Sequence, residues 1–124
     1  MVSARIALPD GEVTVASLHL HWPWPYGQQA QLVELLPALQ ALKGPVFIGG
    51  DFNIVAWSDV MARIEAASET KAISGFRFTK SLLSGVIQLP IDHILAPPNW
   101  PASASIGPRL GSDHNSVIAH FVLN

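Results

Sequence analysis

The sequence predicts an α/β (α+β) fold: a mixed β-sheet with helices on one face. Three features predict it: short apolar runs rich in β-branched residues, two stretches with helical spacing, and their order along the chain, β-β-α-β-α-β-β-β. With 124 residues, 49% of them hydrophobic and 13% charged, the chain is expected to form one domain, residues 1–124, around a packed core.

The first two elements are predicted to be the strands of a β-hairpin. Residues 3–8 and 13–21 flank the sequence Pro9-Asp10-Gly11-Glu12, whose residue types favour a turn. The second run is rich in β-branched and small residues, as strands are.

A helix and a buried strand are expected next. After a loop at residues 22–27, leucines recur at helical spacing between Gln28 and Leu42. Pro37 is expected to kink or split this helix, and Gly44-Pro45 to end it. The apolar run 46–48 then completes a strand–helix–strand unit, which predicts parallel pairing of its two strands.

The second half of the chain is predicted to hold one helix and several short strands. Ser58-Asp59 resemble a helix cap and first turn, with the helix reaching about Ala66. Residues 67–90 show no clear period and are expected to form a loop with one short helix near Ser81. Further strands are expected at residues 91–95, 102–106 and 116–123.

The composition excludes several classes of function. A net charge of −2 gives no overall attraction to nucleic acid, so any phosphate-binding patch must be local. The absence of cysteine excludes disulfides, thiolate nucleophiles and cysteine–zinc sites. No run of about 18 apolar residues occurs, so no membrane-spanning segment is expected within this chain.

Polar side chains gather where four predicted strands begin or end. They are His19 and His21, Asp51 and Asn53, Asp92 and His93, and Asp113 and His114. Carboxylates bind hard divalent cations and histidine titrates near neutrality, so together they suit metal-assisted hydrolysis of a phosphate ester. We expect these segments to converge at one end of the sheet.

Each segment also has a purely structural interpretation. Asp51 and Asn53, two residues apart after a Gly-Gly pair, suit an Asx turn that satisfies backbone amides. His93 faces away from Asp92 on the same strand and is interpreted as structural. Asp92 is harder to explain in this way, because a carboxylate among apolar residues needs a partner. The coincidence of all four segments favours a functional site.

Four motifs carry a family resemblance: Ser17-Leu18-His19-Leu20, Gly50-Asp51-Phe52-Asn53, Ile91-Asp92-His93-Ile94 and Gly111-Ser112-Asp113-His114. Together they resemble the C-terminal portion of the endonuclease/exonuclease/phosphatase superfamily, which includes deoxyribonucleases, apurinic endonucleases, neutral sphingomyelinases and inositol polyphosphate phosphatases. The resemblance implies half of a four-layer α-β-β-α sandwich and a metal-dependent phosphoric ester hydrolase, a phosphodiesterase (nuclease) or phosphatase, using in-line attack by water. The resemblance leaves the substrate open among nucleic acid, phospholipid head groups and inositol phosphates.

The resemblance also implies a role for each site residue. The catalytic side chains would be His19, Asp51, Asn53, Asp92 and His114. Asp113 and Asp51 would hold Mg²⁺ or Mn²⁺. Either Asp51 or His114, the latter oriented by Asp92, would be the general base. Asn53 and His19 would contact the phosphate group.

Two other functional classes stay open. A binding module of the same fold would have no turnover. A transition-metal hydrolase would use His19, His21, Asp51 and His114 as metal ligands. The metal-binding Gln-Glu motif of the superfamily's first half has no counterpart in this sequence. The chain is therefore interpreted as the C-terminal half of a catalytic domain, with little or no activity alone. Its single sheet should expose one apolar face and self-associate through it.

Overall fold

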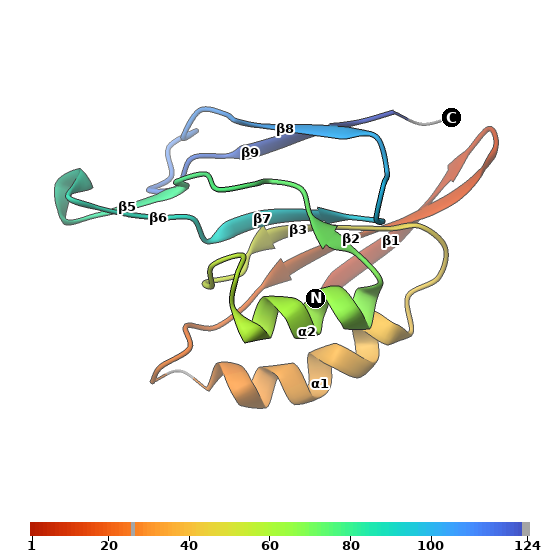
Figure 1. Cartoon of the computed structure of the whole chain (residues 1–124), viewed down its shortest axis with the longest axis horizontal. Helices are drawn as coiled ribbons and strands as arrows, with labels where there is room; N and C mark the ends of the chain where they lie inside the picture. Colours follow the sequence, from red (N-terminus) through yellow and green to blue (C-terminus); the bar gives the residue numbers. More distant parts are fainter. Residues whose placement is uncertain (26, 123–124) are drawn as a thin grey trace.

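A five-stranded mixed sheet forms the central layer of the structure (Figure 1). The computed structural model describes residues 1–25 and 27–122. The strand order is β1-β2-β3-β7-β4, with bounds β1 Val2–Leu8, β2 Gly11–His19, β3 Val46–Asp51, β7 Asp92–Ala96 and β4 Lys71–Ala72. β2 and β3 are parallel, whereas the other neighbouring pairs are antiparallel. The predicted mixed sheet is confirmed.

The first half of the chain follows the sequence prediction closely. β1 and β2 form the expected hairpin, with Val2 opposite Ser17 and Leu8 opposite Gly11. Helix α1 (Gln28–Gln40) connects β2 to β3 and continues through Pro37 without being split. The parallel pairing of β2 with β3 is the one that the strand–helix–strand order predicts.

Two helices cover one face of the sheet, as the sequence predicts (Figure 1). Helix α2 (Asp59–Ser68) begins at the expected cap, where the Ser58 hydroxyl accepts a hydrogen bond from the backbone N–H of Met61 at 3.1 Å. The helices and the sheet enclose the main core, which includes Leu18, Leu32, Leu39, Ile48, Met61, Ile64 and Leu95. Within the described residues, neither helix is both long and apolar enough to span a membrane.

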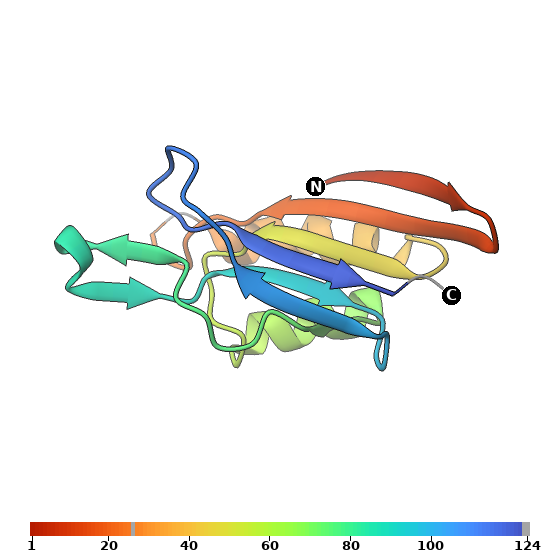
Figure 2. The same ribbon diagram turned by 90° about the horizontal axis from the view of Figure 1, so that it is seen from above.

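The opposite face of the sheet carries a second layer that the sequence analysis did not foresee. Strands β8 (Ala102–Ile106) and β9 (Val117–Phe121) pair only with each other and lie across this face (Figures 1 and 2). Phe47 of β3 contacts the rings of Trp100 and Phe121 edge-on, with centroid distances of 5.2 and 4.5 Å. The expectation of a single sheet with a wholly bare face is therefore wrong.

Part of that face nevertheless stays exposed to solvent. Val15 of β2 lies opposite Ala4 of β1, and Val2 and Ile6 lie on the same side of the hairpin. Val2, Ile6 and Val15 are all exposed, because β8 and β9 lie over β3 and β7 and leave β1 and this part of β2 uncovered (Figure 2). The exposed apolar face is thus limited to the β1–β2 hairpin.

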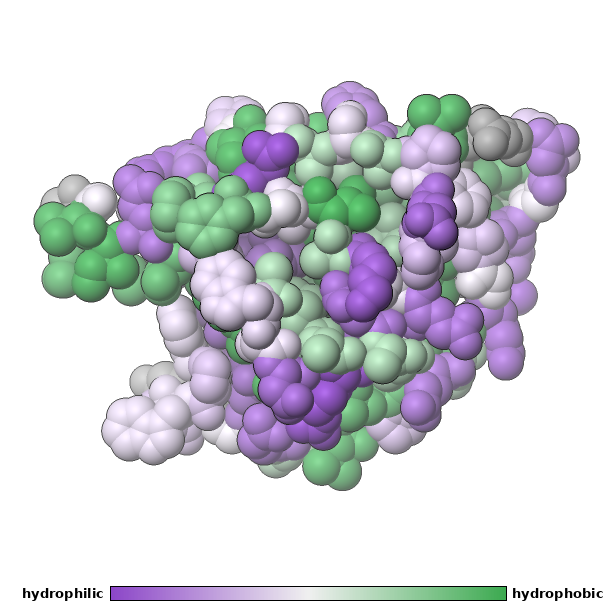
Figure 3. All heavy atoms as spheres, viewed as in Figure 1, coloured by the Kyte–Doolittle hydropathy of each residue, from purple (hydrophilic) through white to green (hydrophobic). Residues whose placement is uncertain are grey.

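Residues 67–90 contain strands where the sequence analysis expected a loop with a short helix. β5 (Lys80–Leu82) and β6 (Ile87–Leu89) form a hairpin around a single 3₁₀ turn, η1 (Leu83–Gly85). Gly85, at φ +93°, supplies the left-handed conformation that closes it. The hairpin projects from the body, and its exposed apolar side chains are visible at the left of Figure 3.

The last strand is shorter than the predicted run 116–123 but lies within it. The end of that run, Leu123, is outside the described residues, as is Tyr26 in the predicted loop 22–27.

Candidate active site

Three neighbouring strands place polar side chains on the face opposite the helices. His19 of β2 lies beside Asp51 of β3, and Asp51 lies opposite Asp92 of β7. Partners in adjacent strands project to the same face, so the three side chains form a row across the sheet. His114, from the segment between β8 and β9, lies against this row.

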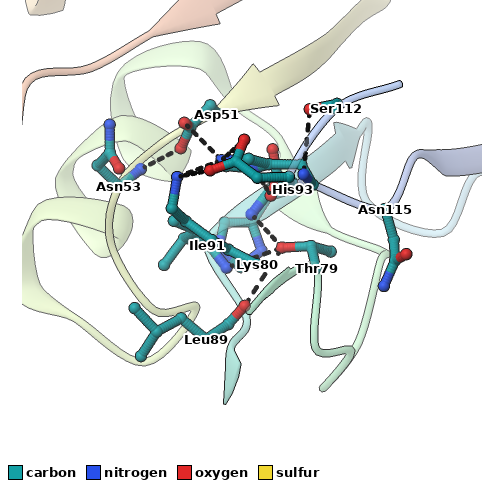
Figure 4. A network of polar contacts seen from close by, with 12 residues as sticks. Asp51, Asn53, Thr79, Lys80, Leu89, Ile91, His93, Ser112 and Asn115 are labelled. Atoms are coloured by element: carbon teal, nitrogen blue, oxygen red, sulfur yellow. Dashed lines mark hydrogen bonds and ion pairs between the residues drawn. The ribbon is translucent and has the colours of Figure 1, made fainter. Parts of the chain in front are cut away.

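Asp92 and His114 make the contact that the sequence analysis expected. His114 Nδ1 lies 2.8 Å from Asp92 Oδ2, and both side chains are largely buried. The backbone around Asp92 is fixed by Thr79, whose buried hydroxyl accepts from the N–H groups of Ile91 at 3.3 Å and Asp92 at 3.1 Å (Figure 4). The carboxylate therefore holds the imidazole ring in one orientation.

Asp51 serves both a turn and the site. Its Oδ1 accepts a hydrogen bond from the Asn53 N–H at 2.9 Å, which is the Asx turn of the structural interpretation. Its Oδ2 lies 3.9 Å from His19 Nε2 and 3.9 Å from His114 Nε2. Burial raises the pKa of Asp51 above its ordinary value, and the nearby Asp92 carboxylate adds to this shift. The Asx turn is therefore present, and the second carboxylate oxygen of Asp51 lies beside two histidines.

Gly50 allows β3 to approach β2 immediately before Asp51. It has φ +153°, and a side chain there would collide with the backbone oxygen of Leu18. At Gly49 a Cβ would make only ordinary contact with Ile94. The close neighbour that Gly50 accommodates is therefore the backbone of the adjacent strand.

Asn53 and helix α1 fix the end of β2. Asn53 is buried and donates from Nδ2 to the carbonyl oxygen of Leu20 at 2.7 Å, which leaves its second amide hydrogen for another acceptor. Gln31 accepts from the His21 N–H at 2.8 Å and donates to the His19 carbonyl at 2.9 Å. The first turns of α1 therefore set the position of the exposed His19 side chain.

Lys80 is a member of the site that the sequence analysis missed. Its Nζ lies 2.9 Å from Asp113 Oδ2 and 2.8 Å from His114 Nε2 (Figure 4). A single lysine in a segment without clear periodicity carries no sequence signal, and only the β5 hairpin brings it to His114. The Lys80 ammonium lowers the pKa of Asp113, whose side chain is 69% exposed at the rim.

A cavity of about 530 Å³ opens beside these residues. It is lined by His19, Leu20, His21, Trp22, Asp51, Asn53, Lys80 and His114. Asp92 lies behind His114 and lines a neighbouring hollow instead. The cavity is thus open to solvent and lined by three histidines, one carboxylate and one lysine among other residues.

Among the described residues, one group of carboxylates and histidines is compact enough to hold a metal ion. Asp51, Asp92 and His114 each offer a ligand atom, and these atoms lie within 4.8 Å of one another. Two carboxylates opposite each other repel, and a hard divalent cation would relieve that repulsion. The donor set therefore suits Mg²⁺ or Mn²⁺. Asp113, the other expected ligand, lies outside this group and pairs with Lys80.

His93 has the structural role expected of it. It is buried on the helix side of β7, donates from Nε2 to the Ile54 carbonyl oxygen at 2.8 Å, and contacts the Ser74 hydroxyl at 3.3 Å. Burial lowers its pKa below the ordinary value because the charged ring loses hydration.

Comparison with known proteins gives a match over most of the chain. The sequence model of a family described as "Endonuclease/Exonuclease/phosphatase family" matches residues 3–114. A UPF0294 protein of Vibrio vulnificus is 29% identical over 124 residues, which cover 94% of this chain and 42% of that protein.

Solved structures share the fold at low sequence identity. An endonuclease/exonuclease/phosphatase family protein from Leptotrichia buccalis C-1013-b has a TM-score of 0.70 and 16% identity, covering 98% of this chain and 52% of that one. The endonuclease domain of TRAS1, a telomere-specific non-LTR retrotransposon, has a TM-score of 0.68 and 16% identity, with coverages of 98% and 63%. The chain spans about half the length of the relatives it matches.

Proposed function

The chain belongs to the endonuclease/exonuclease/phosphatase family, and we propose that its site hydrolyses a phosphate ester by in-line attack of water. Members of this family are generally metal-dependent phosphoester hydrolases. The observation that carries the proposal is the contact of 2.8 Å between His114 and Asp92, beside Asp51 on one sheet face. An oriented imidazole next to a partly buried carboxylate is a combination that acid–base catalysis needs.

The residues that would hold a divalent cation are Asp51, Asp92 and His114, with Asp113 at the rim. Bound there, Mg²⁺ or Mn²⁺ would supply positive charge against the negative charge that develops on the phosphoryl group. All remaining steps fall to side chains of this chain.

Asp51 is the better placed of the two candidate bases. A lysine ammonium can only donate, so His114 Nε2 accepts from Lys80, and the ring proton on Nδ1 is donated to Asp92. Asp51 Oδ2 faces the cavity, and burial raises its pKa, which strengthens it as a proton acceptor. We assign Asp51 to accepting the proton of the attacking water, whereas His114 Nε2, an acceptor in this tautomer, would help to hold the cation.

Asn53 and His19 would contact the substrate from the other wall of the cavity. The second amide hydrogen of Asn53 suits a phosphate oxygen, and the exposed His19 ring can donate from Nε2. The substrate class is a phosphate ester: nucleic acid, a phospholipid head group or an inositol phosphate each offers that group. With no counterpart of the Gln-Glu motif, this chain alone is expected to turn over slowly.

The test is hydrolysis of bis(p-nitrophenyl) phosphate with Mn²⁺, measured at excess protein so that slow turnover is visible. We expect His114→Ala and Asp51→Asn to lower the rate at least about a hundredfold. His120→Ala, at an exposed histidine of β9, is the matched control and should leave the rate unchanged. Equal rates for all four proteins would contradict the proposal. Binding of Mn²⁺ and phosphate without any turnover would favour the binding module.

A further inference from the structure

Lys80 is a cationic side chain inside the site to which neither the motifs nor the relatives assign a role. Its side chain is only 17% exposed, although lysine is usually solvated. Among the described residues that line the cavity, it is the only lysine or arginine. It therefore brings a fixed positive charge to a cavity that also holds the Asp51 carboxylate.

Backbone contacts fix the position of Lys80 relative to Asp92 and His114. Lys80 forms an antiparallel bridge with His114, and the Asn115 N–H donates to the Thr79 carbonyl at 2.7 Å. The Thr79 hydroxyl accepts from the Asp92 N–H at 3.1 Å. The adjacent residues Thr79 and Lys80 thus hold the lysine, the imidazole and the carboxylate in fixed relative positions, as a preorganised site requires.

An ion pair with Asp113 does not by itself account for this arrangement. Asp113 is mostly exposed, and exposed ion pairs contribute little to stability. The same ammonium also lies 2.8 Å from His114 Nε2, which points into the cavity. In the absence of substrate, the Lys80 ammonium thus lies between His114 and the cavity, where a phosphate oxygen would accept a hydrogen bond from it.

We propose that Lys80 is a substrate-binding residue whose ammonium donates to a non-bridging oxygen of the phosphate ester. This inference rests on the proposed function, since it assumes that a phosphate group enters the cavity beside Asp51. When the phosphate arrives, the ammonium exchanges His114 Nε2 for the phosphoryl oxygen. Charge-assisted contacts of this kind are the strong ones in phosphate recognition.

Two titrations of the ¹⁵N-labelled chain, monitored by NMR, test the role of Lys80. The first adds inorganic phosphate and the second, separately, adds Mn²⁺. The proteins are wild type, Lys80→Met, Lys80→Arg and Lys71→Met. Lys71 is the matched control because it is also ion-paired, 2.7 Å from Glu65, but lies away from the cavity.

We expect Lys80→Met to bind phosphate at least about tenfold more weakly than wild type, because one charge-assisted hydrogen bond is lost. The same substitution should bind Mn²⁺ more tightly, because the ammonium no longer competes for Asp113. Loss of fold would weaken both, so the opposite signs identify a local charge effect. Lys80→Arg should retain most of the phosphate affinity, and Lys71→Met should match wild type in both titrations.

Two results would overturn the assignment. If Lys80→Met binds phosphate as tightly as wild type while Mn²⁺ still perturbs Asp51 and His114, the inference about Lys80 fails and the proposed function stands. If wild type binds neither phosphate nor Mn²⁺ at these residues, the proposed function fails and the inference fails with it.

Discussion

Replacing Phe47 by leucine tests whether the β8–β9 layer packs on the sheet and so holds His114 in place. Phe47 is 6% exposed and contacts the rings of Trp100 and Phe121. Each edge-on aromatic pair contributes about 0.5–1.5 kcal/mol beyond area burial, so losing two of them should cost roughly 1–3 kcal/mol. Leucine remains apolar and fills most of the space, so the fold should persist.

Urea denaturation, followed by tryptophan fluorescence, measures this cost directly. Phe78→Leu is the control, because Phe78 is 44% exposed and makes a single edge-on contact with Phe76. We expect its effect on the free energy of unfolding to stay below about 0.5 kcal/mol. Phe47→Leu should also shift the NMR signals of the His114 ring, because the layer that carries it loosens. If the two variants were equally stable, the packing of β8–β9 on β3 would be refuted.

Three further predictions follow from the geometry of the sheet. The free energy of unfolding should fall as the pH drops from 6.5, the ordinary pKa of histidine, toward the lower pKa of His93 in the folded chain. In this range the unfolded chain binds a proton at His93, whereas the buried ring of the folded chain does not. His93→Gln should flatten this slope in urea titrations at several pH values, and an unchanged slope would contradict the assignment. Gly50→Ala should cost at least about 1–3 kcal/mol in the same measurement, because a Cβ meets the backbone of β2, whereas Gly49→Ala should cost much less. Equal costs would show that the strands do not approach so closely. The exposed face of the β1–β2 hairpin should drive self-association at micromolar concentration, seen by sedimentation velocity and reduced by Val15→Ser; a monomer unaffected by Val15→Ser would exclude it.

The elements predicted well are those in which local pattern and tertiary packing agree. The turn residues after Leu8, the cap at Ser58 and the apolar run 46–48 each specify a structure by local chemistry, and the fold preserves all three. The contact of Asp92 with His114 was expected from the family resemblance, which assigns Asp92 to orienting His114.

The features that sequence reasoning missed depend on contacts between distant segments. The β5–β6 hairpin is too short for a clear period, and its register is set by pairing rather than by a buried face. Layering of β8–β9 over the sheet requires Phe47 to meet Trp100 and Phe121, which no local pattern encodes. Lys80 reaches the site only through that hairpin, so its place beside His114 could be found only from the structure.

Paramagnetic broadening by Mn²⁺ tests the central claim, that this sheet face is a metal-assisted site, most directly. Substoichiometric Mn²⁺ is added to the ¹⁵N-labelled chain, and the signal loss of each backbone amide is recorded. We expect broadening centred on Asp51, Asp92 and His114, where the ligand atoms lie within 4.8 Å of one another, and its loss in Asp51→Asn. Broadening centred on Glu65 and Glu69 instead, or equally strong in Asp51→Asn, would contradict it.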